Sequence, residues 1–266
     1  IFLAFEFIFT ALTMPLLIFY GPFQNVKKTL VGMSWATLRH QYIAKAFLSQ
    51  EAIERIIGSD FAINPLEEGE EIQRLNFKVV HTDKIDVFNI DGGTFEGKVM
   101  VVYDPTRIKV GYSSLIPKSG ETTSAIAKRA GAAAAINAGG FIDSKDTGWT
   151  GTGGIPDGYI IHNGEVIYDL YGDENMKMDT VSFTKDGMLI VGRHSLAELK
   201  QYGVVEGVAF GPPLIINGRP TIPEGSDGGW GYAPRTVIGQ RANGEVIMMV
   251  IDGRSLSSLG VTLKDC

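Results

Sequence analysis

The 266-residue chain contains one cysteine, Cys266, and it is the last residue. A lone thiol cannot form an intrachain disulfide or supply the several thiolates of a Cys-based zinc site. The chain therefore differs from the small secreted domains that disulfides hold together. It also lacks an excess of positive charge, because 24 Lys and Arg face 30 Asp and Glu for a net charge of -6. Nucleic-acid binding needs a basic patch or stripe, so we expect no nucleic-acid partner.

Several catalytic and nucleotide-binding motifs are absent as well. The four histidines form no H-x-x-x-H or H-E-x-x-H pair, so each is expected to be structural or exposed. No G-x-S-x-G elbow supports a serine hydrolase. The glycine-rich loop at 147–158 lacks the Gly-Lys-Ser/Thr of a Walker loop, and no helix follows it as in a Rossmann fingerprint. The 33 glycines and 11 prolines are not periodic, which excludes collagen-like and solenoid folds.

Apolar residues gather at the N-terminus. Residues 1–20 carry a single charge, Glu6, and are long enough to span a hydrocarbon core about 30 Å thick at about 1.5 Å per residue. Pro15 is tolerated in a transmembrane helix, and Tyr20 suits the membrane interface. The alternative is a cleaved signal peptide, but the apolar run exceeds the usual h-region and no A-x-A-like site follows. We expect residues 1–22 to be an uncleaved transmembrane signal anchor.

Apolar residues at helical spacing continue after this span and predict helices over residues 24–58. They are Leu30, Met33, Leu38, Tyr42 and Phe47. Ser49 is placed to cap a short second helix that Gly58 ends. An acidic, proline-containing linker follows at 64–71. The chain is therefore divided into a membrane segment (1–22), a helical juxtamembrane stalk with its linker (23–71) and a domain (72–266).

Short apolar runs with a period of two are typical of β-strands and fill the domain. Strands are expected at 76–80, 85–90, 94–103, 107–112, 133–137, 158–162, 181–184, 188–191, 207–210, 213–216, 235–239 and 245–251. Asn-Gly or Asp-Gly pairs at 163–164, 186–187, 217–218 and 243–244 favour tight hairpin turns. One helix is expected at 124–130, capped by Thr122 or Thr123 and ended by Gly131. The pattern predicts an α+β fold with a mixed, mainly antiparallel sheet core and few helices.

Two glycine-rich segments have features of a binding site. An apolar strand runs into Asn137, Gly139 and Gly140, whose backbone can approach a ligand closely and bind its oxygens. The alternative is a bulge or turn at the end of a strand. The loop at 147–158 either covers a site or is a plain surface loop. Its Trp149 could stack on the flat face of a sugar.

Charged residues stand at the ends of two adjacent predicted strands. Arg235 begins one strand, and Asp252 and Arg254 follow the other. Guanidinium groups match the oxygens of a phosphodiester, and a glycosidic carbon needs a carboxylate as nucleophile or to activate water. A surface salt bridge between Arg and Asp is the alternative, and the pattern alone leaves both open. Arg193, on a predicted hairpin, is expected to lie outside this group.

At these residues the chain resembles a known family. The strings INAGGF, a G-G-x-P-x-G loop, GPPLIINGRP, PRTVIGQ, VIDGR and SLGVTL occur in the order found in phosphodiester glycosidases, over about residues 85–266. That family includes the lysosomal enzyme that removes N-acetylglucosamine from its phosphodiester link to mannose, and bacterial members often described as exopolysaccharide-related. The N-terminal anchor, YGPF and the helical H-Q-Y segment also resemble bacterial members.

The resemblance implies a membrane-anchored, extracytoplasmic hydrolase of sugar-1-phosphodiester bonds in cell-envelope or exopolysaccharide glycans. Arg235 and Arg254 would hold the phosphate, and Asp252 would act at the anomeric carbon or on water. Sugar hydroxyls or phosphate oxygens would be bound by Asn137, Gly139 and Gly140, with Trp149 as a stacking residue and with Asp143 and Asp157 as further carboxylate candidates. No cofactor is expected, since a divalent cation at Asp252 or Asp143 has no support in the ligand spacing.

The resemblance also implies a helix and an N-L-D-G-G-(G)-S motif after VTL, which these 266 residues do not include. A chain ending at Cys266 is therefore expected to be weakly active or inactive. Two other function classes stay open. One is a non-catalytic envelope module that binds anionic polysaccharide through the same arginines, and the other is a cell-wall assembly scaffold led by the helices of 24–58. Convergence of Asp252, Arg254 and Asn137 in one pocket would favour the enzyme.

Overall fold

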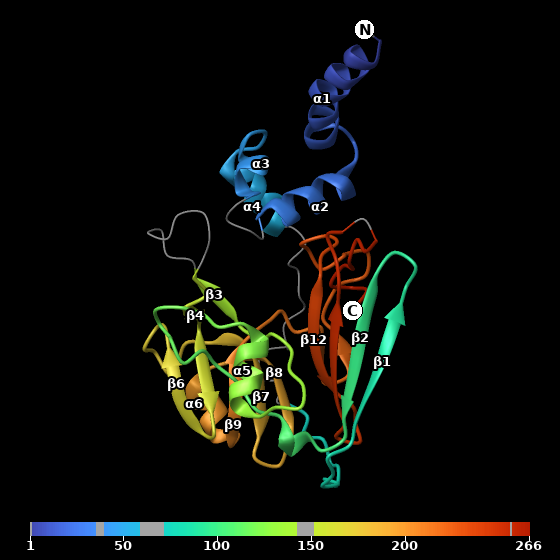
Figure 1. Cartoon of the computed structure of the whole chain (residues 1–266). Helices are drawn as coiled ribbons and strands as arrows, with labels where there is room; N and C mark the ends of the chain where they lie inside the picture. Colours follow the sequence, from blue (N-terminus) through green and yellow to red (C-terminus); the bar gives the residue numbers. More distant parts are fainter. Residues whose placement is uncertain (1, 36–39, 59–71, 143–151, 256) are drawn as a thin grey trace.

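The computed structural model describes residues 2–35, 40–58, 72–142, 152–255 and 257–266. A group of helices lies above two β-sheets that stand beside each other (Figure 1). Every strand pairing among the described residues is antiparallel. The expected α+β fold with a mainly antiparallel core and few helices is therefore confirmed.

The four-stranded sheet has the strand order β1-β2-β13-β12. Its members are β1 (Ile85–Asp91), β2 (Glu96–Val102), β12 (Arg235–Gln240) and β13 (Val246–Ile251). It packs on the other sheet through a shared apolar cluster, in which Met100 and Val246 meet Phe183 from the five-stranded sheet. This contact fixes the relative position of the two sheets, and with it the position of their strand ends.

The five-stranded sheet has the order β6-β5-β9-β7-β8. Its strands are β5 (Tyr159–His162), β6 (Glu165–Asp169), β7 (Met178–Thr184), β8 (Leu189–His194) and β9 (Val204–Ala209). Helix α6 (Leu196–Gln201) closes a second apolar cluster, where Leu199 and Ile190 are fully buried. Burying each such side chain contributes about 1.5–3 kcal/mol. The cores on the two sides of this sheet hold it rigidly.

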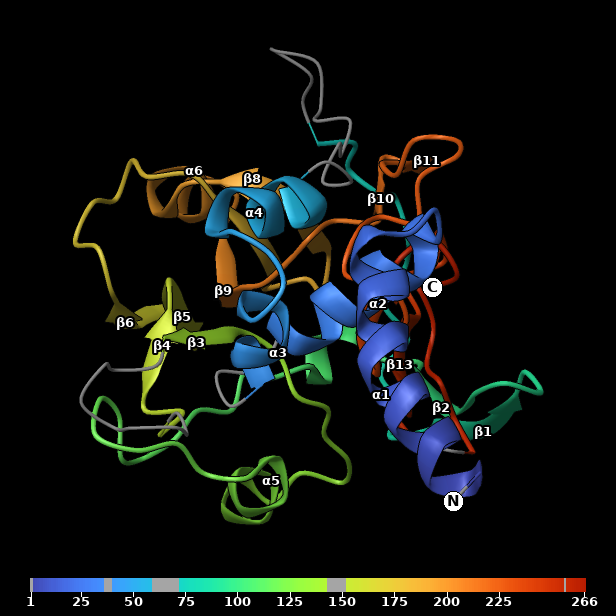
Figure 2. The same ribbon diagram turned by 90° about the horizontal axis from the view of Figure 1, so that it is seen from above.

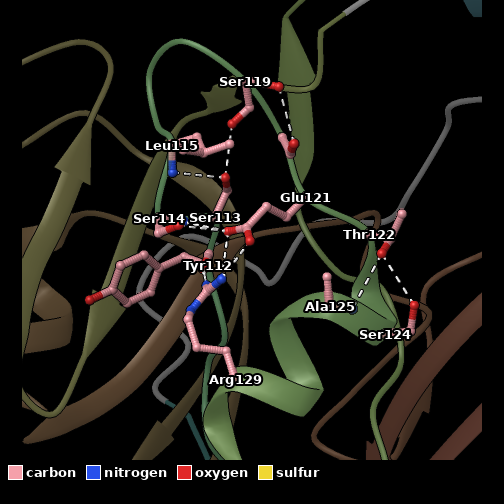
Figure 3. Close-up of polar contacts among 11 residues, drawn as sticks. Tyr112, Ser113, Ser114, Leu115, Ser119, Glu121, Thr122, Ser124, Ala125 and Arg129 are labelled. Atoms are coloured by element: carbon pink, nitrogen blue, oxygen red, sulfur yellow. Dashed lines mark hydrogen bonds and ion pairs between the residues drawn. The ribbon is translucent and has the colours of Figure 1, made fainter.

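Smaller elements complete the domain. They are β3 (Gly140–Ile142) with β4 (Ile155–Asp157), β10 (Ile215–Ile216) with β11 (Arg219–Pro220), the 3-10 turn η2 (Pro105–Arg107) and helix α5 (Thr123–Ala130). As expected, Thr122 caps α5 and Gly131 ends it in the left-handed conformation. Figure 3 shows Glu121 accepting hydrogen bonds from Arg129 and Ser114, which tie α5 to the preceding loop.

The four predicted hairpin turns are confirmed, since each connects two paired strands. Three predicted strands are wrong, because residues 76–80, 107–112 and 133–137 form no strand. In the second of these, the Val110 N–H donates to the Glu206 side chain instead of to a neighbouring strand. The short helix α6 went unpredicted, although Ser195 and Glu198 form a capping box at its start.

The N-terminal helices form a compact cluster. It comprises α1 (Phe2–Tyr20), α2 (Gln24–Trp35), α3 (Gln41–Lys45) and α4 (Gln50–Gly58), and buries Phe19, Val31, Ala44 and Ile53. Ser49 caps α4 as expected, with its hydroxyl accepting from the Ala52 N–H. Leu38 lies outside the described residues.

Helix α1 is strongly apolar and almost entirely exposed. Its most apolar window has a mean hydropathy of 2.1, and 6% of that window is buried. Within the described part of the chain it is the one helix long and apolar enough to cross a membrane. A signal sequence has the same properties, so this helix is apolar enough to be either a membrane span or a signal sequence.

Candidate active site

An open cleft of about 940 Å³ lies where strand ends of the two sheets meet. The four-stranded sheet contributes the start of β12 and the end of β13, and the five-stranded sheet contributes the start of β7 and the ends of β8 and β9. Its polar lining residues are Asn137, Asp157, Lys177, Asp179, Arg193, Arg235, Thr236 and Asp252. Apolar lining residues include Phe210, Pro212, Trp230 and Leu263.

Most of the site residues expected from the sequence meet in this cleft. Its lining contains Asn137, Gly139, Gly140, Asp157, Arg235 and Asp252. Arg254 is not among the lining residues, although its positive charge acts on Arg235 and lowers the pKa of that group. Asp143 and Trp149 lie outside the described residues. The roles assigned to all of these residues stay predictions.

Arg235 is half-buried at the start of β12. Its Nη2 donates to the Gly231 carbonyl at 2.7 Å and its Nε to the Val261 carbonyl at 3.2 Å. Burial lowers the pKa of Arg235 and the positive charge of Arg254 adds to this effect, whereas Cys266 and Asp227 counteract it. The guanidinium still stays charged, because its pKa lies far above neutral.

Neither Arg235 nor Arg254 forms an ion pair with Asp or Glu in the described part of the chain. The salt bridge considered as an alternative is thus not formed between these residues and Asp252. Arg254 has a φ of 59°. Residues other than glycine seldom adopt this left-handed conformation, and residues that do are enriched at ligand and active sites. The negative charge of Asp227 also acts on Arg235, but no salt bridge among the described residues compensates either guanidinium group, so both can bind an anion.

Asp252 follows β13 and is held by its backbone. Its N–H donates to the Glu96 carbonyl at 2.9 Å, and its own carbonyl accepts from the Ser258 hydroxyl at 2.8 Å. The side chain is exposed toward the cleft, and no hydrogen bond to it is found among the described residues. The carboxylate is therefore positioned by the strand end and available to a ligand.

The segment around Asn137 connects to the opposite sheet. The Thr236 hydroxyl donates to Asn137 Oδ1 at 2.7 Å, which places this amide beside Arg235. Gly139 has a φ of 71°, a conformation that favours glycine. Gly140 pairs with Asp157 between β3 and β4. The predicted strand before this segment is absent, but its binding-site end does reach the cleft.

A third carboxylate in the cleft, beside Asp157 and Asp252, was not predicted from the sequence. Asp179 lies on β7 directly opposite Arg193 on β8. Its pKa is raised by burial, an effect that the positive charge of Arg193 reduces. Gly211 leaves the space that this side chain occupies, since a Cβ there would lie 2.6 Å from Asp179 Oδ2. The expectation that Arg193 lies outside the site is wrong, because it lines the same cleft.

One signal in the sequence points to this pair. The Asp186-Gly187 turn fixes the register of its hairpin, and the register places Asp179 opposite Arg193. The sequence does not show which end of the hairpin faces the cleft. The neighbouring Lys177 is held by Glu198 at 2.7 Å, so its charge is compensated.

Aromatic residues border the cleft. Trp230 lines it directly, next to the loop that accepts the Arg235 hydrogen bond. The Tyr171 hydroxyl donates to Asp157 Oδ1 at 3.3 Å. Flat aromatic faces of this kind suit the apolar face of a sugar ring. Within the described residues, no group of three or more His, Cys, Asp or Glu could hold a metal ion.

Comparison with known proteins identifies the family. The family model described as NAGPA, phosphodiester glycosidase, matches residues 130–266, which is more than half of the chain. The chain belongs to the phosphodiester glycosidase family. Members of this family are hydrolases, and the matched region contains the predicted site residues from Asn137 to Arg254.

A curated relative and a solved structure agree with this family. The SPbeta prophage-derived uncharacterized protein YomE of Bacillus subtilis (strain 168) is 30% identical over 152 residues, which cover 54% of this chain and 22% of YomE. The chain thus spans less than a quarter of that relative. The zebrafish N-acetylglucosamine-1-phosphodiester alpha-N-acetylglucosaminidase catalytic domain, auto-inhibited by its pro-peptide, aligns with a TM-score of 0.54 and 18% identity. The alignment covers 76% of this chain and 72% of that one, and shows a shared phosphodiester glycosidase fold.

Proposed function

We propose that this protein hydrolyses sugar-1-phosphodiester bonds in cell-envelope or exopolysaccharide glycans. The observation that carries the proposal is that Arg235, which forms no salt bridge among the described residues, lines the same cleft as the available carboxylate of Asp252, while the positive charge of Arg254 acts on it. Two guanidinium groups suit a phosphodiester, and a carboxylate suits the adjacent anomeric carbon. The family match supports the same reaction class.

In this mechanism the arginines bind the phosphate oxygens. Arg235 is already oriented by two carbonyl groups, so little side-chain freedom is lost on binding. The charge on the departing phosphate grows as the bond to the anomeric carbon breaks. Cations held near it stabilise that transition state more than the ground state.

Asp252 acts on the sugar side of the bond. Its carboxylate either attacks the anomeric carbon or removes a proton from the water that does so. The bond between this carbon and the phosphate oxygen breaks, and the products are a free sugar and a phosphomonoester. Phosphate is a good leaving group, so acid assistance matters less than in an ordinary glycosidase.

Asp179 is the candidate for that weaker acid role. Its raised pKa favours the protonated form, which can donate to the departing oxygen or to a sugar hydroxyl. On the sugar side, Asn137 and the amides of Gly139 and Gly140 bind hydroxyl groups, and Trp230 takes the stacking role first assigned to Trp149. Asp157 holds a further hydroxyl.

Helix α1 anchors the protein, and the domain lies on the extracytoplasmic side. Its 19 residues, at about 1.5 Å per residue, nearly match a hydrocarbon core about 30 Å thick. An anchored enzyme meets envelope glycans at the membrane where they are assembled.

The rival function is a module that binds anionic polysaccharide without turnover. It would use the same arginines but needs no carboxylate aligned with them. Asp252 and Asn137 line the same cleft, which favours the enzyme, but Arg254 is not among the lining residues, so the expected convergence is partial. A scaffold led by the helices of 24–58 would not require this cleft.

The test uses the full-length protein and an N-acetylglucosamine-1-phosphodiester, the bond named in the zebrafish relative's title. Free sugar and phosphomonoester are measured together for the wild type and for Asp252→Asn. We expect equal amounts of both products from the wild type and a loss of about a thousandfold in the variant, within the range that positioned acids and bases contribute. Binding without turnover in both proteins would support the rival function.

A further inference from the structure

The N-terminal helices are packed onto the cleft. At the end of α1, Phe19 is 4% exposed and stacks on Phe47 with ring centroids 4.7 Å apart. It belongs to the same buried apolar cluster as Val31 of α2 and Ile53 of α4. The end of α1 is thus built into the cluster, and the helix leaves it in a fixed direction.

Helix α2 in turn docks on the loop that orients Arg235. A Cβ on Gly32 would lie 2.8 Å from the Trp230 carbonyl oxygen, and a Cβ on Gly231 would lie 2.6 Å from the Thr29 Cα. The backbones of the helix and the loop can approach this closely only because both positions are glycine, which has no Cβ. The Gly231 carbonyl is also the acceptor for Arg235 Nη2. A continuous series of contacts therefore runs from α1 through α2 to the predicted phosphate-binding residue.

The Trp230 loop, which lines the cleft, lies at the end of the domain that carries these helices. Figure 1 shows α1 and α2 above the sheets, and Figure 2 shows the helices from above, lying over the ends of the sheets. Only one helix separates the end of α1 from the Trp230 loop, and a helix is about 10–12 Å across. If α1 spans a membrane, the cleft is held within about that distance of the membrane surface.

Apolar residues line the cleft beside the predicted phosphate position. Trp230, which is partly exposed, and the exposed Pro234, which precedes Arg235 in the chain, are among the lining residues, whereas Ile251 and Leu263 are buried. A soluble glycan phosphodiester gives these side chains little to contact on the far side of the phosphate. A lipid alcohol esterified to that phosphate gives them an apolar chain, whose burial contributes about 0.8 kcal/mol per CH₂ group.

We propose that the substrate is a lipid-linked sugar, in which the sugar-1-phosphate is esterified to a long-chain alcohol in the same membrane. This inference rests on the proposed function. Water adds to the anomeric carbon and the bond to the phosphate oxygen breaks. The free sugar leaves, and the lipid phosphate monoester stays in the bilayer. The docked helices hold the cleft at the depth of the lipid phosphate.

The test compares two diesters of N-acetylglucosamine 1-phosphate in phosphatidylcholine vesicles that contain the full-length protein. One diester carries a C20 isoprenoid alcohol and enters the bilayer, and the other carries methanol and stays in solution. We expect a kcat/KM at least about tenfold higher for the isoprenoid diester when it shares the vesicle with the protein, and little turnover when it is in separate vesicles.

Each outcome decides something different. Equal or faster hydrolysis of the methyl diester overturns the lipid-linked substrate but keeps the proposed function. Equal turnover of the isoprenoid diester in shared and separate vesicles also overturns the inference. Hydrolysis of neither diester overturns the proposed function, and the inference with it.

A pair of variants tests the docked helices. Gly32→Leu forces α2 away from Trp230, and Gly239→Leu is the control because an added Cβ there meets no atom within 4 Å. We expect Gly32→Leu to lower the ratio of isoprenoid to methyl turnover about tenfold and Gly239→Leu to leave it unchanged. An unchanged ratio in a folded Gly32→Leu protein contradicts the docking argument. If that variant does not fold, the vesicle comparison still decides the inference.

Discussion

Two clusters of charge in this protein are arranged in opposite ways. Glu206 on β9 is 1% exposed, and its carboxylate accepts from Lys109, His162 and the backbone N–H groups of Val110 and Asn163. Arg235 and Arg254 adjoin the cleft as two like charges, with no carboxylate paired to either in the described residues. In the first cluster, hydrogen bonds and opposite charges within the protein compensate the carboxylate. In the second cluster, no salt bridge compensates the positive charges, which are left for a ligand to bind.

The difference separates structural from functional charge. A buried carboxylate is tolerated only when its hydrogen bonds are complete, and Glu206 then fastens the 109–110 segment to the sheet. Neighbouring cations without an anion repel each other and cost stability, which evolution tolerates most readily at binding sites. Glu206 should therefore matter for folding and Arg235 for turnover.

The largest expected effect is on stability. Glu206→Ala leaves the Val110 and Asn163 N–H groups and the Lys109 charge without their partner, so we expect a loss of about 3–5 kcal/mol in the free energy of unfolding. Urea denaturation measures it. Glu165→Ala, at an exposed position on β6, is the control and should change stability by less than about 0.5 kcal/mol. Similar losses in both variants would show that the Glu206 cluster is not structural.

The second effect is on catalysis. We expect Arg235→Ala to lower kcat/KM about a hundredfold to a thousandfold, as removal of a transition-state donor does. The control is Arg241→Ala, because Arg241 pairs with Glu245 at the opposite end of β12. It should stay within about twofold of the wild type. Thermal unfolding of both variants shows whether the loss of the Gly231 and Val261 contacts, rather than of the charge, explains the result.

A smaller effect is expected on the other rim of the cleft. Asp179→Asn cannot donate a carboxyl proton, so we expect kcat to fall about tenfold, less than the roughly hundredfold or more usual for acid catalysis, because phosphate leaves readily. In the wild type the activity that needs protonated Asp179 is lost as pH rises through its raised pKa, and the variant should lack this loss. A pH profile of kcat measures both.

Stability gives an independent check on Asp179. Burial raises its folded pKa, so its ionised form destabilises the protein above the pKa of the unfolded chain. Asp179→Asn should therefore be at least as stable as the wild type at pH 7. A variant that is inactive and also less stable would make Asp179 a structural residue.

The smallest effect is the acid dependence of the Glu206 cluster. Burial alone would raise the pKa of Glu206, but hydrogen bonds from Val110, Lys109 and His162 outweigh it and hold the pKa below its ordinary value. Its stabilising contribution is therefore complete above the unfolded pKa, near 4.5, and is lost as pH falls through the lower folded pKa. Denaturation at a series of pH values should show the wild type losing its advantage over Glu206→Gln only in that acid range.

The sequence predicted the rim of the cleft that lies on one hairpin. Arg235 and Asp252 stand at the ends of β12 and β13, whose Asn243-Gly244 turn fixes the pairing, so local rules were sufficient. The place of Asp179 and Arg193 in the cleft depends on how the five-stranded sheet packs on the four-stranded sheet through Met100 and Phe183. No short-range pattern encodes that contact.

The wrong strand predictions have a similar cause, since contacts between residues distant in the sequence decide the structure there. Residues 107–112 have the composition of a strand, but the Val110 N–H is taken by Glu206, which is 96 residues away. The N-terminal helices were found by their spacing, whereas their docking through Gly32 depended on a loop two hundred residues later in the chain. Contacts between residues distant in the sequence determine these features, which local secondary-structure propensity does not predict.

One measurement tests the central claim most directly. The full-length protein is given a sugar-1-phosphodiester in water enriched in ¹⁸O, and both products are analysed by mass spectrometry. A glycosidase that uses Asp252 at the anomeric carbon places the label in the free sugar and none in the phosphomonoester. Label in the phosphomonoester would mean that the phosphorus–oxygen bond breaks, and would contradict the mechanism proposed for this cleft.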